Sequence, residues 1–109
     1  VGYFTTIWQR QQDGSYKWVL DQGDELATPL AEPDMVAAEV ADCGDPLAFA
    51  GIAFAGTPTA EGQGSANDRS LIYGWASYAD GSRRLVVMMR GANGRMEEVL
   101  TSSVAAPAS

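Results

Sequence analysis

Residues 71–102 read LIYGWASYADGSRRLVVMMRGANGRMEEVLTS, and this stretch decides the fold of the chain. Three runs of large apolar residues are separated by Asp80-Gly81 and Asn93-Gly94, which are dipeptides that favour tight turns between antiparallel strands. We therefore expect a meander of strands over 71–78, 83–90 and 95–102. In this register one face of the sheet collects Leu71, Tyr73, Trp75, Leu85, Val87 and Met89. If the turn at Asn93-Gly94 has two residues, Arg90 pairs with Glu97 on a solvated face.

The start of the chain predicts a second hairpin, with strands over 3–9 and 16–21 on either side of Asp13-Gly14. A three-residue loop over 12–14 makes Trp8 face Trp18 and Thr6 face Leu20. A two-residue loop would split the two tryptophans between faces. We favour the first register because it gathers the aromatic residues on a core face, which consists of Phe4, Trp8, Trp18 and Leu20. The opposite face is mixed in polarity and predicts a partly covered surface.

The remaining segments are less regular. Residues 35–42 fit a strand by alternation, although their alanines also suit a helix, and Asp45-Pro46 could begin a short helix. Glycine and small polar residues over 56–68 predict a mobile loop. We expect a mainly β chain of five or six antiparallel strands with at most one short helix. Its expected parts are a hairpin (1–23), a linker (24–34), a β-rich module (35–104) and a tail (105–109).

Composition limits the function classes. The 109 residues carry seven Lys and Arg against fourteen Asp and Glu, a formal net charge of -7. Nucleic acid and anionic membranes attract basic surfaces, so neither is an expected partner. Hydrophobic residues make up 46 % of the chain, which is typical of a globular domain rather than a disordered one. No apolar run reaches the roughly 20 residues of a membrane-spanning helix.

Catalytic and metal-ligating residue types are scarce. The chain has no histidine, which removes the commonest general base and transition-metal ligand, and its one cysteine, Cys43, cannot form an intramolecular disulfide. A serine nucleophile would need the single lysine, Lys17, as its base. The acids Asp21, Asp24 and Glu25 cluster after the second strand, but their spacing does not fit a calcium loop. We therefore assign no catalytic residue, no metal site and no cofactor.

The segment 2–21, GYFTTIWQRQQDGSYKWVLD, resembles the final hairpin of SnoaL-like domains of the ketosteroid isomerase and nuclear-transport-factor-two-like superfamily. The shared pattern is an aromatic strand ending in Trp-x-Arg, then Asp-Gly-Ser, an aromatic, a basic residue and Val-Leu-Asp, about a fifth of the chain. The resemblance implies the C-terminal part of an α+β cone fold, followed by a C-terminal extension found in some bacterial, often exported, members. The family's catalytic acids come mostly from parts that precede this hairpin, so none is carried over.

Two functions follow as expectations. The first is a non-catalytic module that binds a small apolar ligand or a second copy of itself as a homodimer. The second is part of an isomerase or dehydratase whose catalytic residues lie upstream of Val1, since the sequence opens inside a strand-like run without Met or signal peptide. The missing motifs favour the first. The mixed face of the first hairpin supplies the candidate ligand-binding residues, which are Tyr3, Ile7, Val19 and Asp21.

Overall fold

The computed structural model describes residues 1–31, 38–41 and 51–107. Within them it contains six antiparallel strands and no helix, which confirms the expected fold class. The strands are β1 (Gly2–Arg10), β2 (Tyr16–Glu25), β3 (Ala60–Ser65), β4 (Leu71–Ser77), β5 (Arg83–Arg90) and β6 (Met96–Val104). Half of the expected strand over 35–42 and the whole helix at Asp45 lie outside the described residues, and the described half, residues 38–41, forms no strand.

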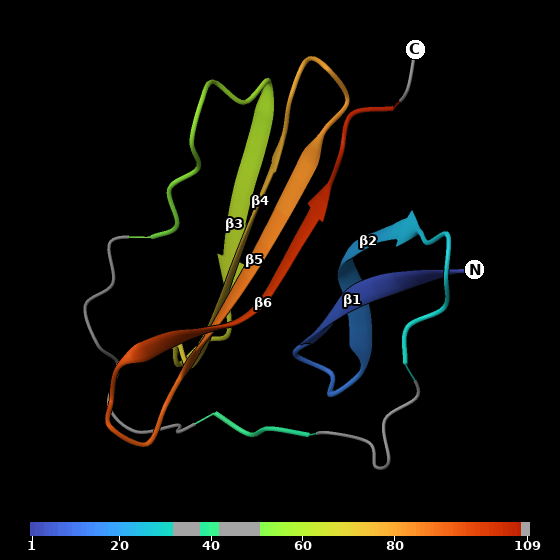
Figure 1. Cartoon of the computed structure of the whole chain (residues 1–109). Coiled ribbons are helices and arrows are strands. Elements are labelled where there is room, and N and C mark those ends of the chain that lie inside the picture. The colour runs from blue at the N-terminus through green and yellow to red at the C-terminus, as the bar shows by residue number, and fades with distance from the viewer. Residues whose placement is uncertain (32–37, 42–50, 108–109) are drawn as a thin grey trace. The chain divides into compact units, whose positions relative to one another are not determined.

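The chain divides into two units, Val1–Ala38 and Glu39–Ser109. The first holds a two-stranded sheet, β1-β2, and the second holds a four-stranded sheet in the order β3-β4-β5-β6. Figure 1 shows the second sheet as a simple meander, in which strands adjacent in sequence are also neighbours in the sheet. Such short connections follow from the turn signals in the sequence.

The predicted register of β4 with β5 is confirmed. Trp75 lies opposite Leu85 and Tyr73 opposite Val87, as the alternation requires. Leu85 is completely buried and Val87 is buried on the same face. Burying a leucine side chain contributes about 1.5–3 kcal/mol, so this face supplies part of the core of the second unit. We call it the Trp75 face. Buried Ile72 and Ala76 lie on the opposite face of β4.

Strand β3 corrects the prediction of a mobile loop over 56–68. Gly62 lies opposite Trp75 and Gly64 opposite Tyr73, and the two aromatic rings of β4 cover these glycines. A Cβ added at Gly62 would lie 2.7 Å from the indole nitrogen of Trp75. Because the glycines have no side chains, the rings pack directly against the backbone of β3. This packing offsets the weak strand propensity of glycine.

The segment 51–55 crosses the other face of the same sheet. Ile52 lies over Gly74, where an added Cβ would meet its side chain at 3.1 Å. The Gln63 side-chain amide accepts a hydrogen bond from the Ile52 backbone N–H at 3.1 Å and donates one to the Ile52 carbonyl. The Tyr78 hydroxyl donates to the carbonyl of Ala55 at 2.7 Å. These side-chain bonds hold a segment without regular structure against the sheet.

The loops of the β1–β2 and β5–β6 hairpins share one turn chemistry. The Gln11 N–H bonds to the Ser15 carbonyl at 2.7 Å, which confirms the three-residue loop over 12–14. The loop glycine, Gly14, has a φ of 87°, a left-handed conformation that glycine adopts without strain. The loop after β5 is built in the same way, because the Gly91 N–H bonds to the Arg95 carbonyl.

This three-residue loop corrects the predicted pairing of Arg90. Because the loop contains one residue more than expected, Arg90 lies opposite Met96, and Glu97 lies opposite Met89. The shift by one position moves Glu97 to the other face of the sheet from Arg90.

The hairpins β1–β2 and β5–β6 have the same geometry. Both have a three-residue loop, and in both β2 and β6 one extra residue interrupts the pairing at the same distance from the loop. That residue is Val19 in the first hairpin and Val99 in the second, so 10–20 and 90–100 align without a gap. The two hairpins therefore share both a loop length and a bulge position.

Candidate functional site

Four aromatic and apolar side chains lie exposed on one face of the β1–β2 hairpin. The exposed fraction is 79 % for Phe4, 58 % for Trp8, 62 % for Tyr16 and 63 % for Trp18. We call these four residues the aromatic face. Soluble proteins rarely leave large aromatic side chains together in solvent, and such a patch marks an interaction surface. The aromatic face is therefore the strongest candidate site in the described part of the chain.

The pairing register explains why these residues share a face. Trp8 lies opposite Trp18, as predicted, and Arg10 lies opposite Tyr16. Side chains of directly opposed residues point to the same side of an antiparallel pair, and every second residue of a strand follows them. Phe4 joins the face by this alternation along β1.

The predicted burial of this face is wrong. We expected Trp8 and Trp18 to anchor a core, but each is more than half exposed. The bulge at Val19 also overturns the expected pairing of Thr6 with Leu20, since Leu20 lies opposite Ile7 and Thr6 lies opposite Asp21. One extra residue in β2 moves Leu20 to the other face. The half-buried face of the hairpin is instead formed by Tyr3, Thr5, Ile7, Leu20, Gln22 and Asp24.

Charged groups are placed unevenly along the aromatic face. Exposed Arg10 lies at the loop end, whereas Asp21 and exposed Glu25 follow towards the open end of the hairpin. The Thr6 hydroxyl donates a hydrogen bond to Asp21 at 3.1 Å, which confirms that both side chains lie on this face. The face therefore has a positive end and a negative end with aromatic rings between them.

The structure does not bring the predicted ligand-binding residues together. Tyr3 and Ile7 share the half-buried face, Asp21 lies on the aromatic face, and Val19 is the 41 % exposed bulge residue. Tyr16 belongs to the site although it was not among the predicted residues. Its position next to the loop opposite Arg10 follows directly from the three-residue loop, so the signal was present in the sequence.

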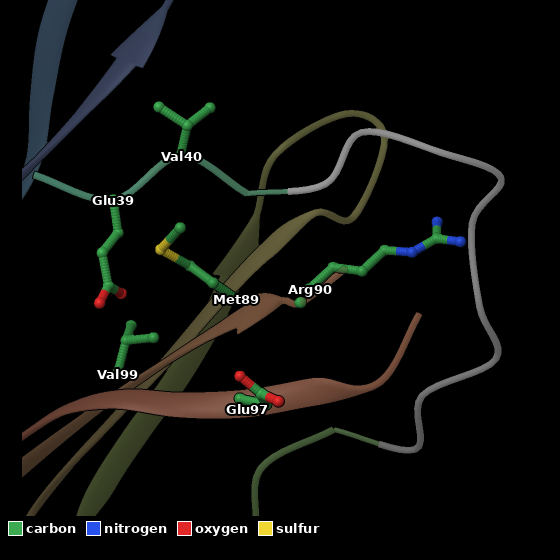
Figure 2. Close-up of a pocket in the computed structure, with 7 residues that line it drawn as sticks. Glu39, Val40, Met89, Arg90, Glu97 and Val99 are labelled. Carbon is green, nitrogen blue, oxygen red and sulfur yellow. The ribbon is translucent and has the colours of Figure 1, made fainter. Parts of the chain in front are cut away.

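A shallow pocket of about 300 Å³ lies in the second unit, between residues of β5, β6 and the segment around Val40. Figure 2 shows Met89, Val40 and Val99 on one side of it and the Arg90 guanidinium pointing away from them. Val40 is 93 % exposed, so one wall of the pocket is a single solvated side chain. The described residues that line the pocket include the carboxylates of Glu39 and Glu97 but no histidine, cysteine or lysine.

Residues 1–31, 38–41 and 51–107 offer little evidence for metal binding, a membrane-spanning helix or a nucleophilic lysine or cysteine. No group of three or more His, Cys, Asp or Glu among them could hold a metal ion. No helix in the same ranges is long and apolar enough to cross a membrane. Lys17 is exposed in β2, and Cys43 lies outside the described residues.

Comparison with known proteins adds no relative to this description. No protein-family model, no curated protein and no solved structure matches the chain.

Proposed function

We propose that this chain is a non-catalytic binding module and that the aromatic face of the β1–β2 hairpin is its binding surface. Its partner is a small apolar ligand or a second copy of the chain. The exposure of Phe4, Trp8, Tyr16 and Trp18 on one face carries this proposal. Tyrosine and tryptophan dominate binding surfaces because they bury large areas and lose little conformational entropy.

The marginal stability of an isolated hairpin supports the same function. A two-stranded sheet is at best marginally stable in water and gains stability when a further surface covers one of its faces. In the described residues the β1–β2 sheet contains two strands only. A partner on the aromatic face would remove apolar surface from water, which contributes about 25 cal/mol per Å² buried.

Titration with Nile red, a neutral apolar dye, tests this proposal. We expect the wild-type chain to bind the dye with a rise in fluorescence, and the double variant Trp8→Gln, Trp18→Gln to bind it at least about tenfold more weakly, the equivalent of 1.4 kcal/mol. Gln12→Ala is the matched control, because Gln12 is exposed in the loop of the same hairpin but not on the aromatic face. Equal dye binding by the wild type and the double variant would refute the aromatic face as the binding surface.

The resemblance to SnoaL-like domains supports the alternative function, part of an isomerase or dehydratase of cone fold. In that case the catalytic acids lie upstream of Val1, and the β1–β2 hairpin forms the end of the cone's sheet. None of the described residues is assigned a catalytic role in this alternative. Isomerase activity on a steroid ketone, measured on the protein with any residues that its gene encodes before Val1, distinguishes the two functions.

A further inference from the structure

Strand β1 has an edge on which no described strand pairs. The Val1 carbonyl accepts a hydrogen bond from Leu26 N–H, and the Gln11 N–H bonds to Ser15, so the odd-numbered residues of β1 turn their backbone groups towards β2. Backbone groups alternate in direction along a strand. The even-numbered residues from Gly2 to Arg10 therefore point their N–H and C=O groups to the free edge.

The second unit shows what occupies this edge in the equivalent strand. Strand β5 matches β1 in loop and bulge position, and it pairs with β4 along the edge opposite β6. β1 carries none of the features that protect free edges, since its nine residues contain no proline and a single charge, Arg10. β2, by contrast, has a bulge and four charged side chains. Among the described strands both outer edges of the β1–β2 sheet lack a neighbour, and only the edge of β1 also lacks these protective features.

We propose that two copies of this chain pair through β1, antiparallel and centred on Thr6, to form a four-stranded sheet in the order β2-β1-β1-β2. This inference deepens the self-association in the proposed function, but it uses the backbone edge of β1 rather than the aromatic side chains. Only pairings that place even-numbered residues opposite even-numbered residues let both edges form hydrogen bonds. Centring on Thr6 gives the longest such overlap, because all of Gly2–Arg10 is then paired.

The side chains complement each other in this register. Phe4 of one copy lies opposite Trp8 of the other, and this aromatic pair occurs twice across the two-fold axis. Cross-strand aromatic pairs are among the favourable pairs in antiparallel sheets. The aromatic faces of the two copies become one continuous surface, and no like charges face each other.

The charges at the ends of the aromatic face also match. Arg10 of one copy lies opposite Gly2 of the other, and Gly2 lies opposite Glu25 in its own hairpin. Arg10 and Glu25 of the other copy are then two strand spacings apart, about 10 Å between Cα atoms. Because Gly2 has no side chain, an arginine and a glutamate can reach across it and form an ion pair at each end of the interface.

Sedimentation velocity of Thr6→Pro and Thr6→Val tests the edge pairing. Both variants lose the bond to Asp21, but only proline removes the outward N–H, and the ladder with β2 keeps its hydrogen bonds. We expect a dimer for the wild type and for Thr6→Val, and a dissociation constant raised about tenfold or more for Thr6→Pro. A monomeric wild type, or a Thr6→Pro dimer as tight as that of Thr6→Val, would overturn the proposal.

A charge exchange tests the register and remains informative if Thr6→Pro does not fold. Arg10→Glu and Glu25→Arg each place like charges across Gly2, and we expect each to weaken the dimer several-fold. The double variant Arg10→Glu, Glu25→Arg restores the opposite charges and should restore the dimer. A double variant no tighter than the weaker single variant contradicts this register. Dye binding that depends on Trp8 and Trp18 in a monomeric chain would retain the proposed function while this inference fails.

Discussion

The hairpins β1–β2 and β5–β6 have the same loop and bulge but very different surroundings. In the second hairpin Leu85 and Val87 are buried, whereas the aligned residues of the first, Thr5 and Ile7, are only half-buried. The difference lies in the neighbours: β4 pairs with β5, and β3 extends the sheet, whereas β1 and β2 pair only with each other in the described residues. The local hairpin geometry therefore does not determine burial, and adjacent strands do.

The two hairpins also differ in the size of their apolar side chains, and the larger side chains belong to the less buried hairpin. The hairpin with fewer neighbours carries the larger apolar side chains, since Trp8 and Trp18 align with Met88 and Glu98 of the covered sheet. A hairpin that functioned only as a solvated ribbon would gain nothing from exposed tryptophans. This contrast supports the proposal that the first unit carries the binding surface.

The largest expected effect is a difference in stability cost between a core substitution in the second unit and a substitution on the aromatic face of the first. Leu85→Ala should lower the free energy of unfolding by about 2–5 kcal/mol, because Leu85 is fully buried and its removal leaves a cavity. Trp8→Ala should cost less than about 1 kcal/mol in dilute solution, because Trp8 is 58 % exposed. Urea denaturation followed by circular dichroism measures both. A loss at Trp8 as large as that at Leu85 would show that the aromatic face is covered within one chain.

A smaller effect is expected where β3 lies beneath the rings of β4. Gly62→Ala places a methyl group against the Trp75 indole and should cost about 1–3 kcal/mol through overpacking. The cost should disappear in a Trp75→Leu background, because the smaller side chain leaves room for the methyl group. Ser65→Ala is the control, since Ser65 is exposed on the same strand. An equal cost of Gly62→Ala in both backgrounds would assign the effect to the backbone instead.

The sequence predicted those elements whose local signals and tertiary surroundings agree. The strands around Asp80-Gly81 and Asn93-Gly94 and the Trp75 face followed from turn residues and alternation. Strand β3 was missed because its glycines have low strand propensity, and only the rings of Tyr73 and Trp75 from the next strand compensate for this. That compensation is a tertiary effect, which a single segment of sequence does not display.

The candidate site was predicted in part, for a related reason. The alternation of aromatic residues correctly placed Trp8 and Trp18 on one face, and the Asp13-Gly14 loop set their pairing. Their burial was mispredicted because it depends on what covers the hairpin rather than on the hairpin. The bulge at Val19 leaves no mark in the apolar pattern, so the far half of β2 was assigned to the wrong faces.

The smallest expected effect is the loss of stability in acid at one hairpin loop of each unit. Hydrogen bonds from the Ser15 hydroxyl and then its backbone N–H lower the pKa of Asp13 below the ordinary 3.8, and Ser82 lowers the pKa of Asp80 in the same way. A carboxyl group whose pKa is lowered by folding adds stability above pH 3.8, and this stability is lost as the pH falls through the folded pKa.

Amide chemical shifts measure this in each unit separately. The Ser15 and Ser82 amide protons should titrate with midpoints below pH 3.8, since each donates to an aspartate carboxylate. The Arg95 amide donates to the neutral Asn93 side chain and should not show this step, which makes the third loop an internal control. Asp80→Asn should remove the step at Ser82 and leave the step at Ser15 unchanged, because the two loops belong to different units. A midpoint at Ser82 above that of an unfolded peptide would mean that folding disfavours the carboxylate, and the loop chemistry that the two hairpins share would then not stabilise them in the same way.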